Sequence, residues 1–172
     1  PLATPFDYTQ DKPRLDSGAD SRPPAPNREV DPTLPEICNC VLRFDSIGIE
    51  QGLSQSSVRV ILQDRRGFIW FGTEDGLNRY DGYTFKVFKR EPSNPNSISD
   101  GWITAMVEDQ DGYLWIGTRL GGLNRFDPVS GTFTKYLHDD TDPHSLSDNH
   151  ISALLVDDSN QLWVGTLSGL NQ

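Results

Sequence analysis

A ten-residue segment that occurs three times limits the possible folds of this chain more than any other feature. The segment DRRGFIWFGT at 64–73 returns as DQDGYLWIGT at 109–118 and as DDSNQLWVGT at 157–166. Gly-Leu-Asn follows each copy, at 76–78, 122–124 and 169–171, and Leu-Ser or Ile-Ser precedes each copy, at 53–54, 98–99 and 146–147. The recurring tryptophans are 45 and 48 residues apart. A period of this length indicates a repeat fold in which each repeat is one structural unit.

Turn signals divide each period into four short strands. The first is expected at 58–63, 103–108 and 151–156, where nearly continuous apolar runs predict strands buried on both faces. An Asp-x-x-Gly or Asp-x-x-Asn turn follows, with its last residue in the left-handed conformation. Further strands are expected at 68–72 and 77–80, and a fourth at 84–88 and 132–137. Helical and leucine-rich repeats do not fit because no 3.6-residue periodicity appears, and a β-solenoid would need shorter coils.

Four short antiparallel strands in a period of about 40–50 residues are typical of a β-propeller blade. The sequence therefore predicts an all-β fold: a β-propeller fragment with two complete four-stranded blades, part of a third, and a disordered N-terminal segment. We expect an initial strand at 41–52, blades at 53–97 and 98–145, and a partial blade at 146–172. Because exposed strand edges recruit other strands, we expect the isolated chain to be unstable, aggregated or assembled into a ring of several copies.

The first 40 residues differ in composition from the rest. Eight of the 12 prolines lie in 1–37, where large apolar side chains are few, so we interpret 1–40 as a disordered proline-rich linker. Cys38 and Cys40 stand one residue apart at its end. Free thiols are expected there, with a strained or intermolecular disulfide as the alternative, and no metal site, because no second ligand pair exists.

The net charge of −10 disfavours nucleic acids and anionic membrane surfaces as partners. No apolar run approaches the roughly 20 residues that span a bilayer. No nucleophile–base constellation, glycine-rich phosphate loop or paired-carboxylate pocket stands out. The sequence thus predicts no catalytic residues and no cofactor in this part of the protein.

Residues that recur at one position of every repeat are interpreted as structural. A large ring between neighbouring blades explains the recurring tryptophans better than a stacking platform does. The glycines two residues later allow close approach of strands. The structural set is Trp70, Trp115, Trp163, Gly72, Gly117 and Gly165.

Residues that vary between repeats are the better candidates for function. In an up-and-down blade, the second–third strand loop and the loop to the next blade emerge on one face, which we call the loop face. The candidate ligand-binding residues there are Glu74, Asp75, Asn96, Asp100, Arg119, Asp148 and Asn149. His138, His144 and His150 share no spacing that would place them around a metal ion, so no metal site is predicted.

These motifs, in the order Leu-Ser, Asp-x-x-Gly-x-Leu/Ile-Trp-Ile/Phe-Gly-Thr and Gly-Leu-Asn-Arg-Tyr/Phe-Asp, resemble the two-component regulator propeller repeat from about Phe44 to Asn171. The resemblance implies the extracytoplasmic (periplasmic) sensor domain of an inner-membrane protein whose output is a histidine kinase in a phosphorelay or a diguanylate cyclase. It implies as partners a small-molecule or oligosaccharide ligand, the remaining blades, downstream signalling modules and a second copy in a dimer. A protein-interaction scaffold and a propeller enzyme such as a polysaccharide lyase stay open as alternatives.

Overall fold

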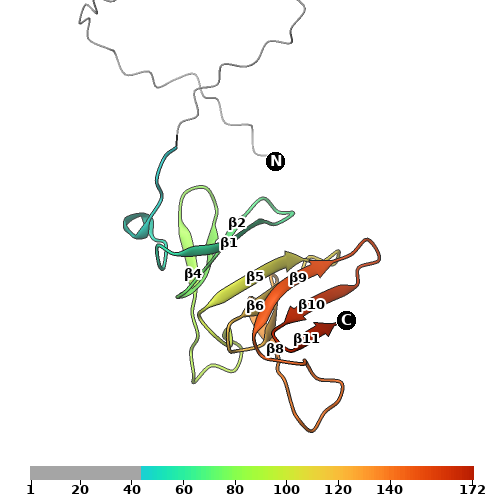
Figure 1. Ribbon diagram of the computed structural model, residues 1–172. Helices are drawn as coiled ribbons and strands as arrows, with labels where there is room; N and C mark the ends of the chain where they lie inside the picture. The colour runs from blue at the N-terminus through green and yellow to red at the C-terminus, as the bar shows by residue number, and fades with distance from the viewer. Residues whose placement is uncertain (1–43) are drawn as a thin grey trace, which may run out of the picture. The chain divides into compact units, whose positions relative to one another are not determined.

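The structure, a computed structural model, describes residues 44–172 (Figure 1). The expectations of a disordered linker over 1–40 and of free thiols at Cys38 and Cys40 lie outside the described residues. So do the first three residues of the expected strand at 41–52.

Three antiparallel sheets follow one another along the chain. Blade 1 is β1 (Val58–Gln63), β2 (Ile69–Thr73), β3 (Gly76–Tyr80) and β4 (Phe85–Phe88). Blade 2 is β5 (Ile103–Glu108), β6 (Leu114–Thr118), β7 (Leu123–Asp127) and β8 (Thr132–Tyr136). Blade 3 is β9 (Ile151–Val156), β10 (Leu162–Thr166) and the three-residue β11 (Gly169–Asn171).

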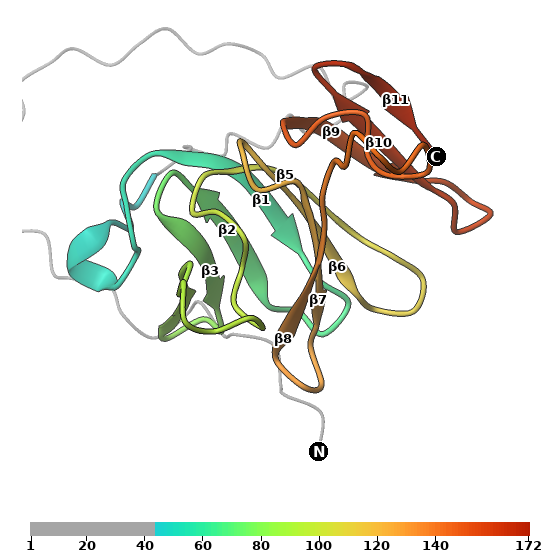
Figure 2. The same ribbon diagram turned by 90° about the horizontal axis from the view of Figure 1, so that it is seen from below.

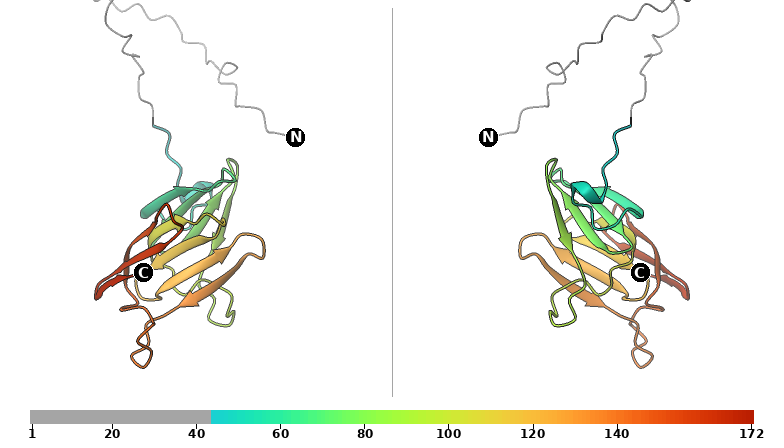
Figure 3. Two further views of the ribbon diagram at one scale, coloured as in Figure 1. Left: turned by 90° about the vertical axis from the view of Figure 1, so that its right-hand side faces the viewer. Right: turned by 90° about the vertical axis from the view of Figure 1, so that its left-hand side faces the viewer.

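Each sheet pairs its strands in sequence order, and β5 lies beside both β1 and β9 (Figures 2 and 3). Short meandering sheets arranged with their first strands together form a β-propeller, as the repeat predicted. The bounds of β1, β5 and β9 are those expected from the sequence, and β2, β3, β4 and β8 differ from their expected bounds by at most one residue at either end.

One aspartate organises the first turn of every blade. In blade 2, Oδ1 of Asp109 accepts hydrogen bonds from the amides of Asp111 (3.0 Å) and Tyr113 (2.9 Å), while Oδ2 accepts from the indole Nε1 of Trp115 (2.8 Å). Asp64 and Asp157 make the same three bonds in the other blades. The indole hydrogen bond, followed by the amides, lowers the pKa of Asp157.

The last residue of this turn is left-handed in all three blades, as expected. Gly67 and Gly112 have φ of 88° and 86°, and Asn160, with φ 61°, is the one non-glycine residue at positive φ in the described part. Asparagine tolerates this conformation better than other side chains, so the third repeat keeps its turn without glycine.

A serine and an asparagine clamp each blade to the segment that leads into it. In blade 2, Oδ1 of Asn124 accepts from the Ser99 amide (3.0 Å), and Nδ2 of Asn124 donates to the Ser99 hydroxyl (2.7 Å). The pairs Ser54–Asn78 and Ser147–Asn171 repeat this geometry. The Leu-Ser and Gly-Leu-Asn motifs therefore recur together because they bind each other.

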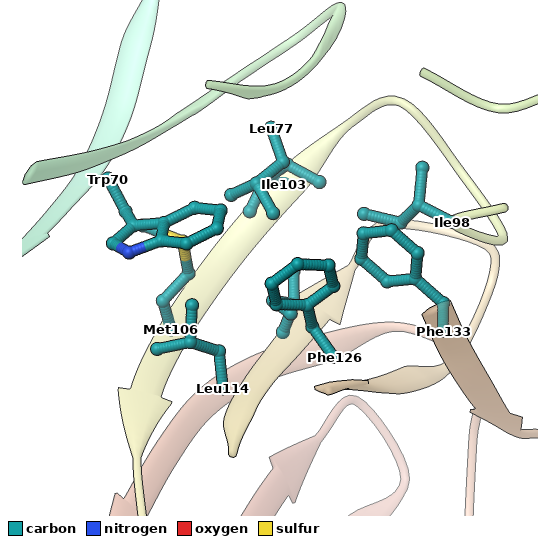
Figure 4. Close-up of a cluster of buried hydrophobic side chains, with 9 residues drawn as sticks. Trp70, Leu77, Ile98, Ile103, Met106, Leu114, Phe126 and Phe133 are labelled. Carbon is teal, nitrogen blue, oxygen red and sulfur yellow. The ribbon is translucent and has the colours of Figure 1, made fainter. Parts of the chain in front are cut away.

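The main core lies between blades 1 and 2 (Figure 4). Trp70 is fully buried there, and its ring meets that of Phe126 edge-on at 5.4 Å between centroids. A smaller core of Leu123, Ile151 and Val164 joins blades 2 and 3, with Trp115 half-buried beside it.

The recurring glycines lie where the first strand of the next blade passes. A Cβ at Gly72 would come within 2.6 Å of Ile103 Cγ2, and a Cβ at Gly117 within 2.5 Å of Ile151 Cγ2. Both distances are below contact, so only glycine allows the blades this separation.

Two expectations differ from the structure. Of the three first strands, only β5 is largely buried, because it alone lies between two described blades; Ile61 in β1 and Leu155 in β9 are 63% and 59% exposed. The initial strand expected at 41–52 is not found over 44–52, where the chain instead forms a short 3-10 helix, Ile49–Gln51. Gly52, at φ 109°, ends this helix in a conformation that a strand residue would not adopt.

Replacing Asp109 with alanine should lower the free energy of unfolding by roughly 3 kcal/mol, because the half-buried indole N–H of Trp115 and two amides lose a charged acceptor. Asp111→Ala is the matched control, since Asp111 is exposed in the same turn and should change stability by less than about 0.5 kcal/mol. Denaturant unfolding of the complete protein measures both. If the two substitutions lower the free energy of unfolding equally, the hydrogen bonds of the turn aspartate do not stabilise the blade.

Candidate ligand-binding site

The second–third strand loops and the loops between blades meet on one face, as the strand order predicted. The amide of Gly76 donates to the carbonyl of Gly101 (2.7 Å), and the amide of Gly122 donates to the carbonyl of Asn149 (3.0 Å). Each bond joins the loop of one blade to the segment that starts the next. The loop face is therefore a continuous surface across blades.

Several predicted ligand-binding residues on this face hold loops in place. Asp148 accepts hydrogen bonds from the His150 amide (2.7 Å) and the Ser168 hydroxyl (2.8 Å). Asp100 accepts from the Leu120 amide (3.0 Å) in the same way. Their carboxylates are thus occupied by the loops of their own blades.

The remaining predicted residues divide into three groups. Oδ1 of Asn149 accepts from the His138 amide (2.8 Å), and Asp75 forms an exposed ion pair with Lys89 (2.6 Å). Asn96 lies apart from the others. Its carbonyl accepts a hydrogen bond from the amide of Phe133. Phe133 is the second residue of the outer strand β8 and lies near the end of that strand that is farther from the loop face. Only Glu74 and Arg119 belong to the cluster described next.

This cluster surrounds a cavity of about 310 Å³ at the start of the inner strands, lined by Arg59, Trp102, Ile103, Thr104, Arg119 and His150. We call it the inner-rim pocket. The guanidinium carbon of Arg119 lies 4.3 Å from the centroid of the Trp102 ring, and that of Arg59 lies 5.6 Å from it. Two cations thus lie against one aromatic ring, an arrangement that orients both.

β-Bulges place two of these side chains. The β1–β2 register skips from Val58 to Val60, so Arg59 is an extra residue in its strand. The β5–β6 register skips Thr104 in the same way. A bulge redirects the side chain that it carries, and here the bulged residues of two blades line one pocket.

Glu74 sits beside the pocket and binds Arg59. Nε of Arg59 donates to Glu74 Oε1 (2.9 Å), the Arg59 Nη2 donates to the same oxygen, and the Ser57 hydroxyl adds a third bond. The Arg59 hydrogen bond is the main reason that the pKa of Glu74 is lowered, and the charge of Arg119 contributes. No carboxylate lines the pocket itself.

Three residues that line the pocket were not predicted from the sequence: Arg59, Trp102 and Thr104. Trp102 carried a signal, because it is the one tryptophan of four that does not recur; its counterparts in the other repeats are Ser57 and His150. Arg59 and Thr104 carried none, since a bulge is not visible in an apolar run. His150 was named in the sequence interpretation only among histidines not expected to form a metal site, and in the structure it lines the pocket.

The imidazole of His138 closes the loop that leads to Asn149. Its Nδ1 lies 2.5 Å from the Leu146 carbonyl and its Nε2 lies 3.0 Å from Asp140 Oδ1. Because both neighbours are acceptors, both nitrogens carry protons in this geometry. The Leu146 carbonyl, followed by Asp140, raises the pKa of His138 above its usual 6.5.

The His138 closure should be present at pH 6 and lost as the pH rises through the raised pKa, because loss of a proton removes one of the two bonds. Histidine NMR titration of the complete protein should give His138 a pKa above the usual 6.5. Asp140→Asn should lower the His138 pKa. A His138 pKa at or below 6.5 would contradict this geometry.

Comparison with known proteins identifies the repeats. The sequence pattern of the two-component regulator propeller matches residues 52–75, 97–119 and 145–168. Over 56 residues the chain is 52% identical to histidine kinase P4 of Formosa agariphila, a match that covers 33% of this chain and 4% of that protein. No helix of the described residues is both long and apolar enough to cross a bilayer.

Two solved structures share the fold. The extracellular domain of a protein described as a hybrid two-component system of B. thetaiotaomicron has 30% identity and a TM-score of 0.67; the match covers 74% of this chain and 20% of that one. PorZ, a surface component of the type-IX secretion system of Porphyromonas gingivalis, has 21% identity and a TM-score of 0.55, covering 69% and 17%. The chain thus spans about a fifth of these solved relatives. Its three repeats, in sequence and in structure, make it a β-propeller of the two-component regulator propeller family, related to extracellular domains of hybrid two-component systems.

Proposed function

We propose that this chain is the ligand-sensing part of an extracytoplasmic, non-catalytic sensor domain in a membrane-bound two-component signalling protein. The observation that carries the proposal is the inner-rim pocket, where non-repeating residues of a repeated scaffold converge. The relation to the extracellular domain from B. thetaiotaomicron and to a histidine kinase supports the signalling context. The output, a histidine kinase or diguanylate cyclase, would lie elsewhere in the complete protein.

The pocket draws its residues from three blades, which suits a sensor. Arg59 belongs to blade 1, Trp102 and Arg119 to blade 2, and His150 precedes blade 3. A ligand that contacts all of them favours one relative placement of the blades over others. Such a differential affinity is what shifts a conformational or dimer equilibrium that an output domain can read.

A protein-interaction scaffold is the second candidate, and one feature favours it. Leu120 and Leu167 are 74% and 69% exposed at the second–third strand loops of neighbouring blades. Exposed leucines on a common face suit a protein partner or a second copy in a dimer. In that case Leu120→Ser would weaken partner binding, while small molecules would leave the protein unchanged.

Trp102→Ala should abolish ligand binding by the complete protein while leaving it folded, because Trp102 recurs in no other blade and orients both arginines. Thermal shift against a panel of sugars, oligosaccharides and amino acids measures this. A compound at 100 times its dissociation constant stabilises the native state by about 2.7 kcal/mol, a readily detected shift.

The matched control is Lys86→Gln, on the exposed face of β4 away from the pocket, which should keep the shift. If no compound stabilises the wild-type protein, or if Trp102→Ala responds like wild type, the pocket is not the sensing site. A compound that changes the signalling output of the wild-type protein, but not that of Trp102→Ala, would support the proposal.

A further inference from the structure

The side chain of Arg119 is not needed to hold the loop in which it lies. Its loop is held by the backbone, since the Arg119 amide donates to the Trp102 carbonyl (3.0 Å). The third blade makes the same bond, from the Leu167 amide to the His150 carbonyl (3.3 Å), with leucine at the equivalent position. The turn therefore does not require a cation at this position. The reason for an arginine here lies in the groups that surround its side chain.

Around Arg119 the charge is unbalanced. Arg59 is paired with Glu74, but no carboxylate among the described residues lies within 4 Å of the Arg119 side-chain nitrogens. Arg119 lies over Trp102, and its side chain makes no hydrogen bond within residues 44–172, so its N–H groups are left for a further acceptor. A guanidinium over a ring keeps these N–H groups in its own plane, where a planar oxyanion can bind them in pairs.

A second, independent observation lies in the wall of the same pocket. The Thr104 hydroxyl is buried and finds no hydrogen-bond partner within the described part of the chain. Buried hydroxyls are almost always satisfied, so an unsatisfied one on a residue that lines a pocket indicates a missing partner. Thr104 is the bulged residue of β5 and lines the same pocket as the two arginines.

We propose that the inner-rim pocket binds the oxyanion group, a carboxylate or a sulfate, of a small ligand, with Arg119 as the main cation, Arg59 as the second and the Thr104 hydroxyl as a neutral partner. This names the ligand class for the sensing site and rests on the function proposed above. The rest of the chain carries net negative charge, so the pocket is a local positive site on an acidic protein. Glu74 competes with the ligand for Arg59 and thereby limits the affinity.

Calorimetric titration of the complete protein with four probes tests this: D-glucuronate, D-glucose 6-sulfate, D-glucose and inorganic sulfate. The two sugar anions should bind about tenfold more tightly than glucose, as expected for one charged hydrogen-bonding partner. Which sugar anion binds more tightly separates carboxylate from sulfate. Binding of inorganic sulfate as tight as that of glucose 6-sulfate would show that the oxyanion alone is recognised.

Two substitutions should move the affinity in opposite directions. Arg119→Gln should abolish the preference for the anions over glucose, and Glu74→Gln should strengthen anion binding several-fold, because it releases Arg59. Lys86→Gln makes the same charge change as Arg119→Gln, on β4, and should leave the preference intact. Thermal unfolding of each variant shows that it is folded.

The outcomes separate this inference from the sensor proposal. Equal binding of anionic and neutral sugars, or an unchanged preference for anions in Arg119→Gln, overturns the proposed oxyanion class. If Trp102→Ala then still loses all sugar binding, the pocket remains the sensing site, but for a ligand of another class. If none of the four probes binds the wild-type protein, the oxyanion proposal fails. The broader compound panel then decides the sensor proposal separately.

Discussion

The structure depends on one carboxylate in each blade, that of the turn aspartate. Its two oxygens accept three hydrogen bonds, two from the turn that starts the second strand and one from the tryptophan of that strand. The same side chain thus fixes the turn and the orientation of the ring that faces the neighbouring blade. Because the indole donor is satisfied within its own blade, the ring can be buried between blades without the penalty of an unpaired N–H.

The remaining recurring residues extend this arrangement outward. The serine–asparagine clamp holds the segment that leads into each blade, and the glycine after the tryptophan allows the next inner strand to approach. Each of these contacts is made by a residue that recurs, so these contacts do not depend on the positions that vary. The varying positions lie at three places in each blade: after the threonine that ends the second strand, before the first strand, and at the bulge of the first strand. They can differ between blades, and they meet at the inner rim. In this protein they supply Arg119, Trp102, His150, Arg59 and Thr104.

The sequence was sufficient to predict the blades but only part of the pocket. Turn residues and apolar runs have a fixed spacing along the chain, so the strands of blades 1 and 2 and the left-handed Asn160 could be placed from it. Glu74 and Arg119 were selected because they vary at a loop position. Arg59 and Thr104 were missed because a β-bulge depends on strand pairing, which local sequence does not show.

Other differences have equally local causes. Asn96 was grouped with the loop face because the connection between blades was treated as one loop, whereas the Asn96 carbonyl accepts a hydrogen bond from Phe133 in the outer strand β8. Asp100 and Asp148 were predicted as ligand-binding residues, and in the structure their carboxylates accept hydrogen bonds from backbone amides and a serine hydroxyl. Polar residues in loops serve the loop first, and only the contacts show which are left over.

Hydrogen exchange of the four indole N–H groups in the complete protein, followed by NMR with labelled tryptophan, tests the central claim most directly. Slow exchange is expected at Trp70, Trp115 and Trp163, whose indoles donate to turn aspartates. Fast exchange is expected at Trp102, whose indole makes no hydrogen bond within residues 44–172. Slow exchange at all four would place Trp102 in the scaffold with the others. Fast exchange at the three recurring tryptophans would show that the aspartates do not hold the blades.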